Sequence, residues 1–154
     1  MPDVINGGCA CGRTSYTLND TPILEVVCHC VDCQRASGGA FAALLFVAGP
    51  RLTIRGEAPK YFATTGKSGR VLERGFCPEC GTPLLLRWPN NNKLMLLHAG
   101  SLEQPATFSP AIELWCSQAA DWHPTFDGVA KSAEGPDRQV LKAAIEAHAQ
   151  SPKR

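Results

Sequence analysis

Seven of the eight cysteines in this 154-residue chain fall into three short groups, and no other feature constrains its fold as strongly. The groups are Cys9-Ala10-Cys11, Cys28-His29-Cys30-Val31-Asp32-Cys33 and Cys77-Pro78-Glu79-Cys80. Residues 1–8 carry neither a basic start nor an apolar run, so we expect no secretion signal and a cytoplasmic protein. Cytoplasmic thiols stay reduced, which favours metal binding. Disulfides, or a redox C-x-x-C that would need a thioredoxin-like setting, are the weaker alternatives.

The first and third groups are each a cysteine pair followed by glycine. In a C-x-x-C-G knuckle the tight turn puts both sulfurs on one side, and the glycine lets the backbone turn away. One such pair supplies two ligands, whereas a closed tetrahedral zinc site needs four. Thiolate ligation favours zinc over magnesium or calcium, with iron as the main competitor. We therefore predict one structural zinc site made by Cys9, Cys11, Cys77 and Cys80.

The middle group brings three thiolates, Cys28, Cys30 and Cys33, into six residues, and no fourth cysteine lies nearby in sequence. Three protein ligands plus one exchangeable position is the pattern of catalytic zinc. Three thiolates weaken the ion as a Lewis acid, so the site suits a soft fourth ligand such as a substrate thiolate. We predict these cysteines to be both metal ligands and catalytic residues. A three-ligand site loses its metal more easily, so one zinc per chain is a realistic outcome.

Two other residues are candidates for closing this second site. Cys116 stands alone and is either the fourth ligand or a buried apolar cysteine. His29 lies between two predicted ligands, and alternation turns its side chain the other way, which favours a supporting or core role. His98 ends an apolar stretch and is interpreted as a strand-end histidine with its own partners. His123 and His148 are interpreted as surface or packing residues.

Hydrophobic alternation and frequent turn residues predict a mainly β fold of many short antiparallel strands. The predicted strands are residues 13–18, 23–27, 42–47, 52–55, 61–64, 71–76, 84–88, 94–99 and 112–115. A short helical turn is expected over residues 33–37. Residues 136–149 carry one apolar stripe and predict a C-terminal helix that begins at Pro136. We divide the chain into a zinc-binding domain, residues 1–130, and a linker with the packed C-terminal helix, residues 131–154.

Charge and hydropathy exclude two classes of partner. The formal net charge is +1, which gives no basic field for nucleic-acid binding. No stretch approaches the ~20 apolar residues that a membrane-spanning helix needs. A homodimer through an exposed sheet edge is compatible with the pattern of short strands.

Four sequence blocks resemble one known family. Residues 8–16, GCACGRTSY, are similar to its opening, and residues 28–38, CHCVDCQRASG, to its core signature. Residues 66–70 and 74–81 resemble its third block, and residues 99–105 with Trp122 its closing segment. Together, across about residues 6–126, these blocks resemble the glutathione-dependent formaldehyde-activating enzymes, a family that includes centromere protein V. The resemblance implies a β-tent fold of antiparallel sheets around two zinc ions, with the same division of the seven cysteines.

The resemblance also implies an activity. It is the reversible combination of glutathione with formaldehyde to S-(hydroxymethyl)glutathione, a carbon–sulfur lyase or synthase step. We therefore expect a zinc-dependent enzyme acting on a small thiol adduct, with glutathione as a thiol partner. Arg35, Lys67 and Arg70 are candidates for anchoring carboxylates of such a substrate, and Ser37 either contacts a bound adduct or closes a turn. The alternative is a non-catalytic zinc scaffold that binds a partner.

Overall fold

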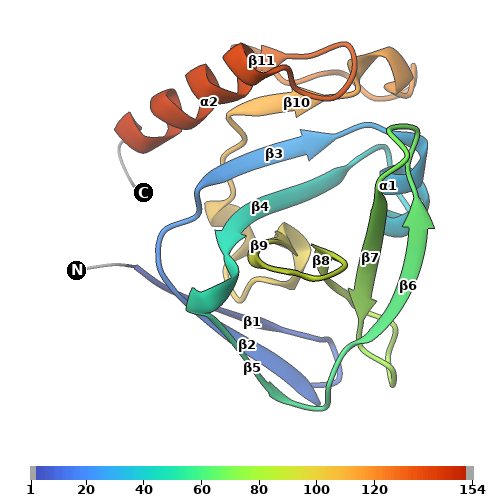
Figure 1. Ribbon diagram of the computed structural model, residues 1–154, viewed down its shortest axis with the longest axis vertical. Coiled ribbons are helices and arrows are strands. Elements are labelled where there is room, and N and C mark those ends of the chain that lie inside the picture. The colour runs from blue at the N-terminus through green and yellow to red at the C-terminus, as the bar shows by residue number, and fades with distance from the viewer. Residues whose placement is uncertain (1–2, 152–154) are drawn as a thin grey trace.

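The computed structural model describes residues 3–151, which form two β-sheets, two α-helices and several short 3-10 turns (Figure 1). This confirms the prediction of a mainly β fold with a C-terminal helix. The outermost residues of the two predicted domains, 1–2 and 152–154, lie outside the described residues. No described helix is long and apolar enough to cross a membrane.

The smaller sheet has three antiparallel strands in the order β1-β2-β5. They are β1 (Val4–Gly8), β2 (Thr14–Asn19) and β5 (Leu52–Gly56). In β2 the alternation is strict, because Thr14, Tyr16 and Leu18 are buried while the residues between them are partly or fully exposed. Strand β1 was not predicted, since its sequence VINGG contains two glycines and little alternation.

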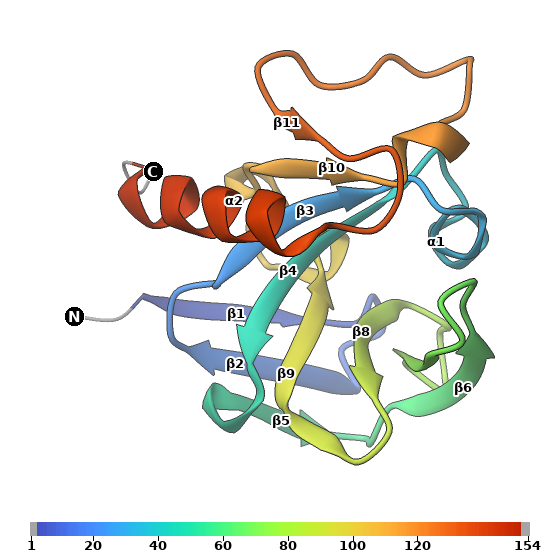
Figure 2. The ribbon, with the colours of Figure 1, turned by 45° about the horizontal axis from the view of Figure 1, so that its top comes forward.

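The larger sheet has eight strands in the order β11-β10-β3-β4-β9-β8-β7-β6. Its strands are β3 (Leu24–Cys28), β4 (Ala42–Ala48), β6 (Lys60–Thr65), β7 (Val71–Phe76), β8 (Pro83–Trp88), β9 (Asn91–His98), β10 (Ile112–Leu114) and β11 (Ala130–Lys131). Along the part of the sheet that runs β3-β4-β9-β8-β7-β6, every neighbouring pair of strands is antiparallel, as expected. The sheet curls so that its β8, β7 and β6 end approaches the smaller sheet (Figures 1 and 2).

The exception to the antiparallel pattern is β10, which pairs in parallel with both β3 and β11. A parallel partner must return from the far end of the sheet, and no local sequence pattern marks such a pairing. The predicted strand over residues 112–115 ends one residue early, because Trp115 takes a left-handed backbone conformation with φ of 58°. The chain then enters the 3-10 turn Cys116–Gln118.

The two α-helices are α1 (Val31–Ser37) and α2 (Arg138–Gln150). Helix α2 begins two residues later than predicted, because Asp137 is the N-cap and its side chain accepts a hydrogen bond of 2.8 Å from the Val140 amide. The predicted domain boundary at residues 130/131 falls inside β11, which is hydrogen-bonded to β10. Further 3-10 turns cover Gly49–Arg51, Ala99–Ser101 and Pro105–Thr107.

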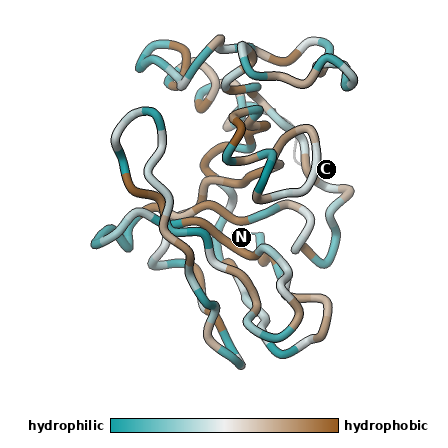
Figure 3. Tube along the Cα trace, turned by 90° about the vertical axis from the view of Figure 1, so that its right-hand side faces the viewer, coloured by the Kyte–Doolittle hydropathy of each residue, from teal (hydrophilic) through white to brown (hydrophobic). Residues whose placement is uncertain are grey.

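The apolar side chains form two clusters, one on each side of the central strands. One lies under α2, where Ala144 is buried and Val140, Leu141 and Ile145 pack against the face of β3 and β4. The other joins the small sheet to the large one. Figure 3 shows hydrophobic stretches along the central strands and hydrophilic residues mostly at the turns.

A close approach of backbone and side chain fixes how the two sheets meet. The Tyr16 hydroxyl and the Ser101 hydroxyl are 2.7 Å apart, and Ser101 donates to the carbonyl of His98. Gly7 forms a bridge with Leu102, and a Cβ at Gly7 would overlap the Tyr16 ring. Only glycine fits there. This contact holds the end of β1, and therefore Cys9, against the large sheet.

Candidate metal centres

Four sulfur atoms from distant parts of the chain converge where the small sheet meets the end of β7. The ligand atoms of Cys9, Cys11, Cys77 and Cys80 all lie within 4.8 Å of one another. The Cys9–Cys11 and Cys11–Cys77 sulfur separations are 3.5 and 3.7 Å. A tetrahedron with Zn–S bonds of about 2.3 Å places its sulfurs about 3.8 Å apart. The four sulfurs therefore fit a closed tetrahedral zinc site, and iron fits the same donor set.

Local hydrogen bonds support two of these sulfurs, those of Cys9 and Cys80, as metal ligands. The Thr14 amide donates to Cys9 Sγ at 3.2 Å. Thr82 links the two halves of the site, since its Oγ1 accepts from the Ala10 amide at 3.1 Å and lies 3.1 Å from Cys80 Sγ. The Thr82 hydroxyl and amide are the main causes that lower the pKa of the Cys80 thiol to about 5. Lowered pKa values favour the thiolate that a metal requires.

The second cluster forms where β3 ends and α1 begins. Cys28 is the last residue of β3, Cys30 caps α1, and Cys33 lies in its first turn. Their sulfurs lie within 4.8 Å of one another. The Cys33 amide donates to Cys30 Sγ at 3.4 Å, which fixes the turn. Cys28 and Cys33 are buried and Cys30 is half-buried.

The three sulfurs of this second cluster hold negative charge unequally. Contacts with Cys28 and Cys33 lower the pKa of Cys30 to about 2, and the positive charge of Arg74 adds to this effect. The neighbouring sulfurs, Cys30 first, raise the pKa of Cys28. Arg74 Nη1 lies 4.0 Å from Cys33 Sγ. In the sequence Arg74 is only one of several scattered basic residues, and its distance from Cys33 along the chain leaves no local signal of this contact.

His29 points away from the three cysteines, as alternation predicts, and enters a buried polar network. Its Nε2 lies 2.9 Å from the Glu113 carboxylate, which also accepts from Lys131 Nζ at 3.0 Å and the Phe126 amide at 3.2 Å. Cys116 Sγ lies in this group, within 4.8 Å of ligand atoms of His29 and Glu113, rather than among the three cysteines. Because three donors already satisfy Glu113, we interpret the group as a hydrogen-bond network around the Glu113–Lys131 ion pair, which holds the loop between β3 and α1.

Two glutamines tie the same loop to the segment after β10. The side-chain amide of Gln34 donates to the backbone carbonyls of His29 and Gln118 at 2.7 and 2.9 Å. The Gln118 side chain in turn accepts from the Val31 amide at 2.9 Å. Neither glutamine was singled out from sequence, because amide side chains carry no metal-site signal.

The predicted carboxylate anchors lie outside both cysteine clusters. Arg35 is exposed on α1, and Lys67 and Arg70 are exposed in the turn between β6 and β7. Figures 1 and 2 show that turn beside α1. Ser37 accepts from the Gly39 amide and donates to the Phe41 carbonyl at 2.7 Å, which favours the turn-closing role over contact with an adduct.

His98 is buried at the end of β9. Burial and then the charge of Arg74 lower its pKa from 6.5 to about 4. The folded protein therefore holds His98 neutral, whereas the unfolded chain takes up a proton below pH 6.5. Stability from this group is complete above pH 6.5 and is lost as the pH falls towards 4.

We expect acidification from pH 7.5 to 5 to lower the free energy of unfolding by about 2 kcal/mol through His98. Urea unfolding of wild type and of His98→Gln at both pH values measures this change in the free energy of unfolding. Other titrating groups are common to both proteins, so the difference between their pH dependences isolates this histidine. Equal pH dependences would contradict the assignment.

Two comparisons with known proteins found similarity. The family model described as "glutathione-dependent formaldehyde-activating enzyme" matches residues 4–118, which hold both cysteine clusters. A crystal structure of a Rhodobacter sphaeroides protein matches with 18% identity and a TM-score of 0.46, over 64% of this chain and 87% of that chain. No curated protein matches significantly. The family model covers more than half of the chain, and the chain therefore belongs to the glutathione-dependent formaldehyde-activating enzyme family.

Proposed function

We propose that the chain is a cytoplasmic, zinc-dependent carbon–sulfur lyase or synthase of the S-(hydroxymethyl)glutathione synthase type. The observation that supports it most is the second cluster, in which Cys28, Cys30 and Cys33 gather three sulfurs without a fourth cysteine. The family description adds glutathione and formaldehyde as the substrate class. All eight cysteines, each in the described part of the chain, are free of disulfides, which suits reducing surroundings.

We further propose that two zinc ions are held, one by Cys9, Cys11, Cys77 and Cys80 and one by Cys28, Cys30 and Cys33. When bound, the second ion would supply positive charge that keeps thiolates deprotonated at neutral pH and leaves one position for a soft ligand. In this proposal Cys28, Cys30 and Cys33 hold the ion, and Arg74 balances the negative charge of their sulfurs. The network of His29 and Glu113 keeps the cysteine loop in place.

The remaining residues position the reactants. Arg35, Lys67 and Arg70 would pair with the carboxylates of a glutathione-like thiol. The substrate thiol loses its proton to solvent, and its sulfur adds to the carbonyl carbon of formaldehyde. The carbonyl oxygen then takes up a proton, so that one C–S bond forms and the C=O bond becomes a C–OH bond. Because thiols add to formaldehyde readily, holding the two reactants together supplies much of the rate gain.

The test is exchange NMR between free formaldehyde hydrate and its glutathione adduct at equilibrium. We expect micromolar zinc-loaded protein to raise the exchange rate at least about tenfold, a barrier reduction of about 1.4 kcal/mol. A chelator-treated sample should fall back towards the uncatalysed rate. The namesake reaction would be ruled out by an exchange rate that the loaded protein leaves unchanged.

A non-catalytic scaffold is the second candidate, and one observation favours it. Phe62 is 65% exposed on β6, one of the two edge strands of the large sheet. An exposed aromatic side chain beside unpaired backbone groups suits strand pairing with a partner or a second copy of the chain. A homodimer in solution together with unchanged formaldehyde exchange would favour this candidate over the enzyme.

A further inference from the structure

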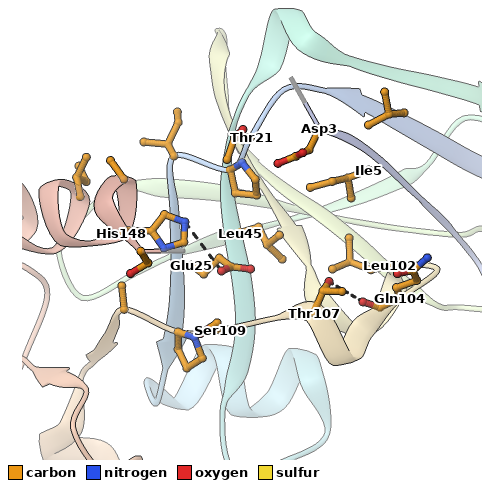
Figure 4. A pocket seen from close by; sticks show the side chains of 18 of the residues that line it. Asp3, Ile5, Thr21, Glu25, Leu45, Leu102, Gln104, Thr107, Ser109 and His148 are labelled. Atoms are coloured by element: carbon orange, nitrogen blue, oxygen red, sulfur yellow. Dashed lines mark hydrogen bonds and ion pairs between the residues drawn. The ribbon is translucent and has the colours of Figure 1, made fainter. Parts of the chain in front are cut away.

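A cavity of about 750 Å³ lies away from both cysteine clusters, between β1, β3, the segment 102–111 and α2. Figure 4 shows Glu25 near its centre, with His148 of α2 on one side and Leu102 and Thr107 on the other. Its volume falls within the range of about 300–1,000 Å³ that is typical of small-molecule sites. Glu25 precedes Cys28 by three residues of β3, or about 10 Å of strand. The cavity is therefore separate from the proposed reaction site.

Among the described residues, the carboxylate side chains that line this cavity outnumber its basic groups, of which His148 is the one present. Asp3, Glu25 and Glu103 line it, and none of the described lining residues is lysine or arginine. His148 is the basic group closest to Glu25, with Nε2 3.9 Å from the carboxylate. Burial lowers the pKa of His148, so it is neutral at pH 7 and above. An anionic compound such as glutathione would be repelled, whereas a cation would be attracted.

Glu25 gives the cavity a defined anchoring point. The residue is only 8% exposed, and burial raises the pKa of its carboxyl to about 7 against a weaker opposing effect of the Ser109 amide. Within residues 3–151, the basic side chain beside it is the neutral His148, and no lysine or arginine pairs with it. A buried carboxylate without a full counter-charge is costly, and a cationic ligand would relieve that cost.

The lining around the carboxylate is partly apolar and partly polar. Its apolar side chains come from both sheets, the loops beside them and the C-terminal helix, through Ile5, Ile23, Leu45, Leu102 and Ile145. Helix α2 lies beyond residue 118, where the family match ends, and its residues Ile145, His148 and Ala149 complete the wall. Helix α2 therefore closes one side of the gap between the two sheets.

We propose that this cavity binds a small organic cation, a primary amine with an apolar body, whose ammonium group pairs with the Glu25 carboxylate. The apolar body lies against the side chains of the two sheets and α2. Asp3 and Glu103 attract the cation to the entrance. The binding does not depend on a metal or on the proposed reaction.

The test compares three indole compounds that share one body and differ in charge. Tryptamine is the cation, tryptophol is neutral and indole-3-propionate is the anion. At pH 8, where Glu25 is ionised, we expect tryptamine to bind with a Kd below about 1 mM, at least tenfold tighter than the other two. Amide chemical shifts in ¹H–¹⁵N NMR spectra should change along β1, β3 and α2, and not around the cysteine loop.

Matched variants locate the interaction. Glu25→Gln keeps the size of the side chain and should weaken tryptamine binding at least tenfold. Ala149→Arg places a positive charge on a lining position and should do the same, whereas Ala147→Arg, an exposed neighbour that does not line the cavity, should bind as wild type does. The proposal is overturned if tryptamine shows no saturable binding, if tryptophol binds equally well, or if both Glu25→Gln and Ala149→Arg leave the Kd unchanged.

Discussion

Cys77→Ser is expected to unfold most of the protein at room temperature. Cys77 is completely buried in the cluster that joins the two sheets, and its sulfur lies 3.7 Å from that of Cys11. A structural zinc site contributes about 10–16 kcal/mol of apparent binding free energy, which is comparable with the whole stability of a domain. Serine supplies a harder oxygen ligand and leaves a polar hydroxyl in an apolar interior.

Far-UV circular dichroism and metal analysis of the purified variant measure this effect. We expect loss of the cooperative thermal transition and less than one equivalent of tightly held metal. Cys116→Ser is the matched control, because Cys116 belongs to neither the group of four nor the group of three sulfurs. It should keep the transition and the metal content of wild type. A Cys77→Ser protein that melts like wild type would exclude a stabilising metal at this site.

Cys30→Ser should abolish the enzyme's acceleration of formaldehyde exchange, so that the rate gain of at least about tenfold is lost, while leaving the protein folded. Cys30 is the least buried of the three sulfurs in the second cluster. It also caps α1 through the Cys33 amide, and serine is among the best N-cap residues. The substitution therefore keeps the local backbone but takes away the thiol with the lowest pKa. Two remaining sulfurs hold zinc poorly, since protein zinc sites use three or four ligands.

Three measurements decide this second prediction together. The exchange rate should fall to the uncatalysed value, metal content should fall by one equivalent at most, and the thermal midpoint should stay within a few degrees of wild type. Cys116→Ser again serves as the control, with exchange unchanged. If Cys30→Ser exchanged formaldehyde as fast as wild type, the three-sulfur cluster would have no part in the reaction.

The strands that could be predicted from sequence are those whose alternation is local. Thr14 to Leu18 alternates between buried and exposed positions, and Leu84 to Leu86 form a continuous buried run. Both patterns can be read from neighbouring residues because a strand has a side-chain period of two. Strand β11 has two residues and two exposed positions, so it shows no pattern at all. It exists because β10 offers an edge at the right place.

Within each knuckle, the order of residues along the chain is enough to show which sulfurs belong together, since residues two to five apart cannot separate far in space. The local pattern of apolar and polar residues likewise indicates a mainly β chain with a C-terminal helix. The folded chain was needed to show that Cys11 meets Cys77, that Arg74 lies beside Cys33, and that Glu113 lies opposite His29. It was needed equally to show that α2 closes a cavity over Glu25. These contacts join residues that are far apart in the sequence, and they depend on strand order and register, which arise from packing of the whole core rather than from any local pattern.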